Sequence, residues 1–254
     1  MPYHTPELSA QEVLHHVQNL LEETMPLKAD GYKCSTDDLF KVLLGVAATK
    51  STLEAVCANL AGTPEPHTIR GYFNEYLCVE ELPALEQQLN AALAAEVPRH
   101  VRRRSQKVAI DYHDRPYYGK GEQVQELWVR GKAKDGTTRF YRVATAYLIL
   151  NGLRVTLALH FVLPEDEAVG VVDGLLHRVH AQGIGISCLL LDKGFESIVM
   201  MEYLTRQGQA ALIACPIRGT TGGTRALCQG RKSYATTYTF KDKQGQAFTA
   251  PVLV

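Results

Sequence analysis

The sequence predicts an α/β protein in which a helical N-terminal region is followed by a mixed sheet with flanking helices. Apolar residues recur at helical spacing through residues 1–98. From residue 107 onward, short apolar runs are separated by turn signals, which is typical of strands. The later runs alternate strand, helix and strand, which favours parallel crossovers. We therefore expect three regions, 1–98, 99–215 and 216–254.

Each helix expected in the first region is marked by an apolar stripe. The stripes are Leu14, Val17, Leu20 and Leu21; then Leu39, Val42, Leu43 and Val46; then Leu53, Val56 and Leu60; and finally Ile69, Tyr72, Phe73 and Leu77. Residues 35–38 (Ser-Thr-Asp-Asp) form a helix start signal. Two short helices, a turn and a third helix are compatible with a helix-turn-helix. A plain helical bundle is the alternative interpretation.

The second region contains the sheet. We expect strands over 107–111, 125–130, 140–150, 153–163, 186–191 and 210–214, and helices over 165–181 and 196–207. Asn151-Gly152 is a strong hairpin signal between two of these strands. Gly183 and Gly208 are expected to end the two helices.

The third region begins with a segment rich in Gly, Thr and Arg, residues 216–232, which we expect to be a mobile loop. Strands are expected over 234–240 and 247–254, as the start of a β-rich insertion that the chain does not complete. The sequence carries no signal peptide and no apolar run of membrane length, so a cytoplasmic protein is expected. The six cysteines form no CxxC pair and are expected to be reduced thiols.

The formal net charge of zero hides an uneven distribution. Residues 1–98 carry 5 Lys/Arg and 14 Asp/Glu, whereas residues 99–154 carry 13 Lys/Arg and 5 Asp/Glu. A basic middle segment is typical of a protein with an anionic partner, and nucleic acid is the leading candidate. A solvated basic face that balances the acidic region is the alternative.

Two aspartates follow short apolar runs and are the candidate catalytic residues. Asp111 follows Val-Ala-Ile, and Asp192 follows Leu189-Leu190-Leu191. Ligands gather at the carboxyl ends of strands in open α/β sheets, so two neighbouring strands would bring both carboxylates to one metal ion. Mg²⁺ prefers carboxylate oxygens, water and substrate phosphate. We therefore expect Asp111 and Asp192 to bind Mg²⁺, with Mn²⁺ as a substitute.

Residues 109–120 (AIDYHDRPYYGK) and 189–197 (LLLDKGFES) resemble the first and second acidic motifs of DDE-type transposases from prokaryotic insertion sequences. The resemblance covers about 105–215. It implies an RNase H-like catalytic core and, in a full-length enzyme, metal-dependent DNA strand cleavage and transfer in DNA transposition. It also implies double-stranded element ends as the partner and a homodimer as the assembly.

The sequence departs from that family at the third acid. The family places a glutamate on a later helix, and no such helix follows residue 215. Glu196 and Glu202 directly follow Asp192 and do not match its position. We therefore expect a truncated transposase that is inactive alone, so its status as an enzyme is open.

Two other functions are compatible with these residues. One is a non-catalytic DNA-binding or regulatory protein with a degenerate RNase H-like domain. The other is a repair or junction-cleaving nuclease of RNase H-like type. In the transposase interpretation, the cations expected to contact DNA are Arg102, Arg103, Arg104, Arg115, Lys120, Arg130 and Lys132, and for each of them a solvated surface position is the alternative.

Overall fold

The chain divides into two compact units, Met1–Glu96 and Val97–Val254. A computed structural model describes residues 8–120, 125–228 and 230–254. Each unit has its own apolar core, and each is described by itself below.

The first unit is mainly helical, as the apolar stripes predict. Its elements are α1 (Ala10–Thr24), β1 (Asp30–Gly31), β2 (Cys34–Ser35), α2 (Thr36–Thr49), α3 (Leu53–Asn59), α4 (Pro66–Tyr76), η1 (Val79–Glu81) and α5 (Leu82–Glu96). The small β1–β2 ribbon is not predicted by the sequence patterns. Ser35 begins α2 with a reciprocal capping box, in which its hydroxyl and the Asp38 carboxylate satisfy each other's backbone N–H groups. Leu39, Phe40 and Ile69 are fully buried in the core of this unit.

The second unit is built on a mixed sheet. The strands of this unit are β3 (Ser105–Pro116), β4 (Val129–Lys134), β5 (Thr137–Leu150), β6 (Leu153–Val162), β7 (Gly185–Leu191), β8 (Ala211–Ile213), β9 (Ala235–Lys241) and β10 (Ala247–Leu253). Strands β9 and β10 form a separate two-stranded sheet. Its helices are α6 (Arg99–Arg102), α7 (Ala168–Ala181) and α8 (Ile198–Arg206), with 3-10 turns η2 (Gln125–Leu127), η3 (Lys193–Phe195) and η4 (Gly223–Leu227).

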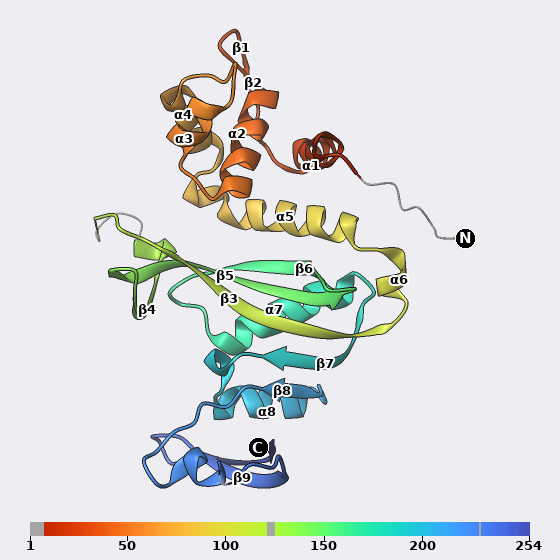
Figure 1. Cartoon of the computed structure of the whole chain (residues 1–254), viewed down its shortest axis with the longest axis vertical. Coiled ribbons are helices and arrows are strands. Elements are labelled where there is room, and N and C mark those ends of the chain that lie inside the picture. The colour runs from red at the N-terminus through yellow and green to blue at the C-terminus, as the bar shows by residue number, and fades with distance from the viewer. Residues whose placement is uncertain (1–7, 121–124, 229) are drawn as a thin grey trace. The chain divides into compact units, whose positions relative to one another are not determined.

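The strand order of the main sheet confirms the predicted RNase H-like fold (Figure 1). Strand β3 lies in the centre. On one side it pairs antiparallel with β5, which pairs antiparallel with β6. On the other side it pairs parallel with β7, which pairs parallel with β8. Helix α7 connects β6 to β7, which do not pair with each other, and α8 is the crossover helix of the parallel pair β7 and β8.

Two hairpin turns organise the antiparallel half of the sheet. Asn151 and Gly152 both have positive φ, at 52° and 81°, so the predicted turn joins β5 to β6. Asp135 and Gly136 form the corresponding turn between β4 and β5, and their φ angles are also positive, at 51° and 78°. Both turns match the twist of their strands, and together they make β5 the partner of β4 and β6.

Several expected boundaries are wrong. Helix α7 begins at Ala168 rather than at residue 165, and β5 begins at Thr137 rather than at residue 140, directly after the Asp135-Gly136 turn. The strand expected over 125–130 begins only at Val129, because residues 125–127 form the turn η2. The first strand does not end at Asp111 but continues to Pro116, because β5 is long enough to pair with it to that point. Helix α8 begins at Ile198 rather than at residue 196, because the Ser197 hydroxyl caps the backbone N–H of Met200 at 3.2 Å.

The first residues of the basic segment 99–104 form the short helix α6. The core of the second unit lies on the face of the sheet that carries Val108 and Ile110, against Val172, Leu175 and Val179 of α7. All six cysteines are free, as expected; Cys34 is buried and Cys228 is exposed.

Candidate metal centre and its surroundings

Asp111 and Asp192 lie on neighbouring parallel strands. The register of β3 with β7 ends at the pair Ile110 and Leu191, so each aspartate is the next residue of its chain. Ile110 and Leu191 are buried on the helix-covered face. Because side chains alternate along a strand, both aspartates are placed toward the opposite face. Residues 81 apart in sequence are thus neighbours at one edge of the parallel pair.

The two aspartates are held in different ways. Asp111 is half-buried in the middle of β3, directly opposite Thr145 of β5. Its carboxylate has no hydrogen bond or ion pair from the described residues. Asp192 is exposed and extended, and its side chain accepts a hydrogen bond from the backbone N–H of Lys193 at the start of η3. Asp111 is therefore fixed by a strand and Asp192 by a turn.

This donor set fits Mg²⁺ in number and in kind. Mg²⁺ sites in proteins typically use one or two carboxylates and complete the shell with water and substrate phosphate. Among the described residues, no group of three or more His, Cys, Asp or Glu side chains is placed to hold a metal ion. Asp111 and Asp192 would therefore be the protein ligands of one ion.

A polar network lies beside Asp111 on the same face. Thr145 contacts His113 Nε2 through its hydroxyl at 3.0 Å, and Arg154 of β6 donates to both groups, at 2.7 Å to Thr145 and 2.9 Å to His113. Since a guanidinium can only donate, His113 Nε2 is the acceptor and its proton is on Nδ1. Arg154 also lies over the Tyr147 ring at 3.7 Å. The site therefore has a fixed cation, Arg154, which the sequence patterns do not reveal.

The opposite face of β3 carries a second pair. Asp114 accepts two hydrogen bonds from the Arg142 guanidinium, at 2.7 and 3.0 Å, across the β3–β5 pair. The same guanidinium lies 4.8 Å from the centre of the Tyr112 ring. Asp114 raises the pKa of Arg142, and burial raises the pKa of Tyr112. Asp114 is thereby engaged in an ion pair that holds β5 against β3.

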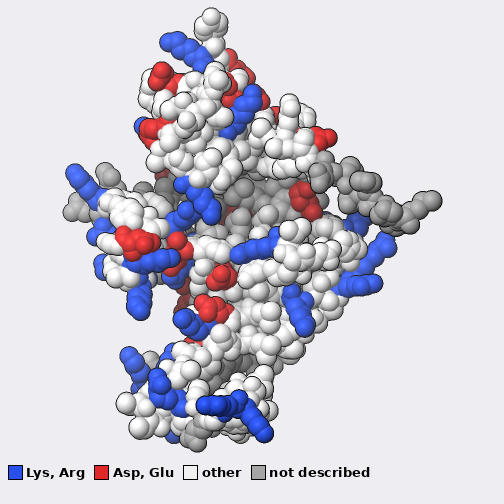
Figure 2. All heavy atoms as spheres, viewed as in Figure 1, with Lys and Arg blue, Asp and Glu red and all other residues white. Residues whose placement is uncertain are grey.

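The cations predicted to contact DNA do not form one patch. Arg102, Arg103 and Arg104 lie directly before the start of β3. Arg115 lies near the other end of β3, beyond Asp111, and Lys120 follows that end. All five side chains are exposed. The eleven residue steps from Arg104 to Arg115 span about 35 Å of strand. Arg130 and Lys132 are exposed on β4. Figure 2 shows Lys and Arg side chains gathered over the region where Figure 1 draws β4, with acidic side chains among them.

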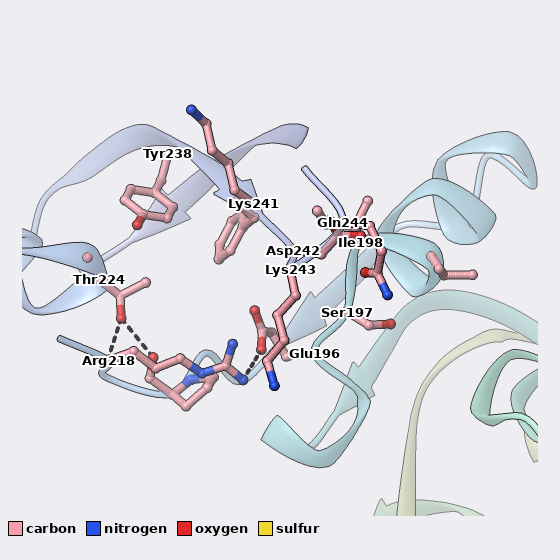
Figure 3. A pocket seen from close by; sticks show the side chains of 14 residues that line it. Glu196, Ser197, Ile198, Arg218, Thr224, Tyr238, Lys241, Asp242, Lys243 and Gln244 are labelled. Carbon is pink, nitrogen blue, oxygen red and sulfur yellow. Dashed lines mark hydrogen bonds and ion pairs between the residues drawn. The ribbon is translucent and has the colours of Figure 1, made fainter. Parts of the chain in front are cut away.

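A cavity of about 560 Å³ lies at the start of α8, against the loop 216–228 and the β9–β10 hairpin (Figure 3). Neither Asp111 nor Asp192 lines it. Glu196 faces Arg218 there, with Oε2 and the guanidinium nitrogen 2.7 Å apart, without the alignment of a hydrogen bond. The Glu196 side chain is only 7% exposed, whereas Arg218 is 67% exposed. Glu196 thus lines this cavity, where Arg218 is its cation.

The loop beside the cavity is folded on itself. The Thr224 hydroxyl donates to the Pro216 carbonyl at 2.8 Å and accepts from the Arg218 N–H at 2.7 Å. Arg225 Nε donates to the Gly219 carbonyl at 2.7 Å. The loop 216–228 contains the turn η4 and these internal hydrogen bonds. Its mobility, which the composition of residues 216–232 predicts, remains a prediction.

No family of known sequences matches this chain, and no curated protein matches it either. Among solved structures, the chain is similar to a piggyBac transposase in a synaptic complex with hairpin DNA. The identity is 15% and the TM-score is 0.42, and the match covers 96% of this chain and 52% of that one. The chain therefore spans about half the length of that protein. A match this remote does not carry a function across, so the function rests on the site itself.

The described residues include no helix that is both long and apolar enough to cross a membrane. The helix-turn-helix interpretation of the first unit is untested and remains a prediction. In that unit, Arg70 of α4 is engaged in an ion pair with Glu54 of α3.

Proposed function

We propose that this chain carries the metal-binding half of a DNA-processing site of the DDE transposase type. The observation that supports it is the register of Asp111 and Asp192, one residue beyond the last pair of two parallel strands. In this proposal both carboxylates bind Mg²⁺, or Mn²⁺ in its place, and the substrate is double-stranded DNA. A bound ion would supply the positive charge that phosphoryl transfer requires.

Other residues of the chain would position the two carboxylates and attract the DNA. Strand β3 holds Asp111, and the turn η3 at the end of β7 holds Asp192; both strands are paired on either side within the sheet. Arg154 places a positive charge on the Asp111 face, where it can attract a DNA phosphate. Among the residues that the structure describes, no third carboxylate joins the pair. We therefore expect the chain to bind metal and DNA without cutting DNA by itself.

Metal binding is the direct test. Mn²⁺ binding is measured by electron paramagnetic resonance and by titration calorimetry, for the wild type and for Asp111→Asn and Asp192→Asn. The amide keeps the shape of the side chain and removes its charge, so either substitution should abolish binding. Glu202→Gln is the matched control, because this substitution removes the same charge from an exposed position on α8 of the same unit.

Equal Mn²⁺ binding by all four proteins would overturn the proposal. Loss of binding in the Glu202 variant as well would point to a general charge effect. DNA binding without any metal binding would favour the alternative of a non-catalytic DNA-binding protein.

A further inference from the structure

The β4–β5 ribbon carries two arginines that face each other. Arg130 of β4 and Arg139 of β5 are directly opposite in the register, so their side chains share one face of the ribbon. Neither guanidinium forms an ion pair with any acid among the described residues. Like charges placed opposite each other in a sheet are destabilising. The ribbon thus holds a repulsive pair that an anion would relieve.

Both guanidinium groups lie over one indole ring. The central carbon of Arg130 is 5.8 Å from the centre of the Trp128 ring, and that of Arg139 is 5.1 Å from it. Guanidinium groups stack on aromatic faces and keep their hydrogen-bond donors available at their edges. Trp128 therefore positions two cations close together without neutralising either of them.

The indole is not fixed by a hydrogen bond of its own. Trp128 is only 8% exposed, and its Nε1 has no hydrogen-bond partner among the described residues. A buried donor without an acceptor lowers stability. An apolar side chain without that donor would serve the core better, so the indole is explained by the two cations that it positions.

The ribbon is also braced near its tip. The Tyr118 hydroxyl donates to the Asp135 carbonyl at 2.8 Å, and the Thr137 hydroxyl donates to the Tyr117 carbonyl at 2.9 Å. Arg139 reaches the Gly119 carbonyl at 3.4 Å. Because the turn is tied to the segment after β3, the ribbon is pre-organised and does not have to be ordered by a ligand.

We propose that Arg130 and Arg139, positioned by Trp128, form a clamp for the phosphate backbone of duplex DNA. Residues 129–139 carry four Lys/Arg and a single acid, and Arg130, Lys132 and Lys134 are exposed. A two-stranded ribbon has the width that the major groove of DNA accepts. Planar guanidinium groups match the geometry of phosphate oxygens. The inference rests on the proposed function, since it takes duplex DNA as the partner, and it adds Arg139 and Trp128 to the interface.

The chain contains a single tryptophan, so its fluorescence reports on this site alone. A labelled DNA duplex is titrated into the full chain, with binding followed by anisotropy and the clamp followed by Trp128 emission. The double variant Arg130→Ala with Arg139→Ala should lose about tenfold in affinity or more. Its plot of log affinity against log salt should become shallower by about two, roughly one for each lost phosphate contact.

The matched control is Arg206→Ala with Arg231→Ala, which removes the same charge from exposed positions elsewhere in this unit. It should bind DNA as the wild type does and show the same change in Trp128 emission. The double lysine variant, Arg130→Lys with Arg139→Lys, keeps the charge and the fold but loses stacking and the planar donor fork. It should retain the salt slope and bind more weakly, which tests the clamp if the alanine variant fails to fold.

Equal loss in the clamp and control variants would overturn the clamp and leave the proposed function intact. DNA binding with no change in Trp128 emission would do the same. A wild-type chain that binds no duplex at any salt concentration would overturn both the clamp and DNA as the partner. Failure of Mn²⁺ binding alone would remove the metal site and leave the clamp standing.

Discussion

Tyr112 and Phe195 stack face to face, with ring centroids 4.4 Å apart and ring planes inclined by 19°. The first follows Asp111 on β3, and the second ends the turn η3 that begins at Asp192. Phe195 is almost fully buried. The stack therefore joins the two segments that carry the candidate metal ligands, on the face of the sheet opposite to them.

This stack should control both stability and metal affinity. Phe195→Ala is expected to lower the free energy of unfolding by about 3–5 kcal/mol, since it removes a buried ring. It should also weaken Mn²⁺ binding, because η3 holds Asp192. Urea denaturation followed by circular dichroism measures the first effect, and calorimetry below the transition measures the second. Phe195→Leu is the control, and its smaller loss should leave metal binding in place. Normal Mn²⁺ affinity in a folded Phe195→Ala protein would contradict this link.

The ion pair of Asp114 with Arg142 should stabilise the sheet through its geometry as well as its charge. Arg142→Lys keeps the charge but loses the fork of two hydrogen bonds and the contact with the Tyr112 ring. We expect a loss of roughly 1–2 kcal/mol, measured by urea denaturation. Arg142→Met, paired with Asp114→Leu, removes both charges together and should cost no more than the single change. A larger loss in that double variant would show that the pair stabilises the native state in its own right.

Tyr203 should make the protein sensitive to alkali. Its hydroxyl donates to Asp173 Oδ1 at 2.6 Å, and burial together with that carboxylate raises its pKa well above the usual range. The folded protein keeps a proton that the unfolded chain releases above pH of about 10. The contribution to stability is therefore present below that pH and is lost as the pH rises further. Tyr203→Phe should flatten the loss of stability between neutral and strongly alkaline pH. If the fall of stability with alkaline pH is as steep in Tyr203→Phe as in the wild type, other groups cause it. Burial also raises the pKa of Tyr112, so Tyr112 would be the next residue to test.

Arg218 should contribute to the stability of the fold, because it is the cation paired with the buried carboxylate of Glu196. Arg218→Ala would leave the Glu196 carboxylate facing the cavity without its cation, and a loss of about 1–3 kcal/mol is expected. Glu196→Gln leaves only an exposed arginine and should cost less. The double variant should recover part of the loss, because no buried charge is left unpaired. Thermal unfolding at neutral pH measures all three. Additive losses would show that the two side chains act independently.

The order of strands and helices follows from the sequence because each element has a local signal. The Asn151-Gly152 turn requires positive φ at both residues, so it defines both the β5–β6 hairpin and its register. Asp135-Gly136 carries the same signal, and applying it there would place the end of β4 and the start of β5, which the apolar patterns over 125–130 and 140–150 miss. The position of the two aspartates follows from the strands that precede them.

The surroundings of the aspartates do not follow from local signals. Beyond Asp111 the chain continues with polar residues, which suggests the end of a strand. The strand persists because those side chains find partners on β5, as Asp114 does with Arg142 and His113 does with Thr145. Arg154 reaches the same place from β6. Contacts of this kind depend on pairing between distant segments, which no periodicity in a single sequence reveals. The cavity beside Glu196 likewise requires the β9–β10 hairpin to pack near α8.

The six free thiols differ enough to allow selective chemical labelling of the native chain. Burial raises the pKa of Cys34, Cys57 and Cys215, so these thiols form little of the reactive thiolate at neutral pH. Cys228 is exposed, directly after η4 in the loop that lines the cavity. A brief reaction with a maleimide probe should therefore mark Cys228 first. A spin label or fluorophore there would follow movement of the loop without the introduction of any new residue.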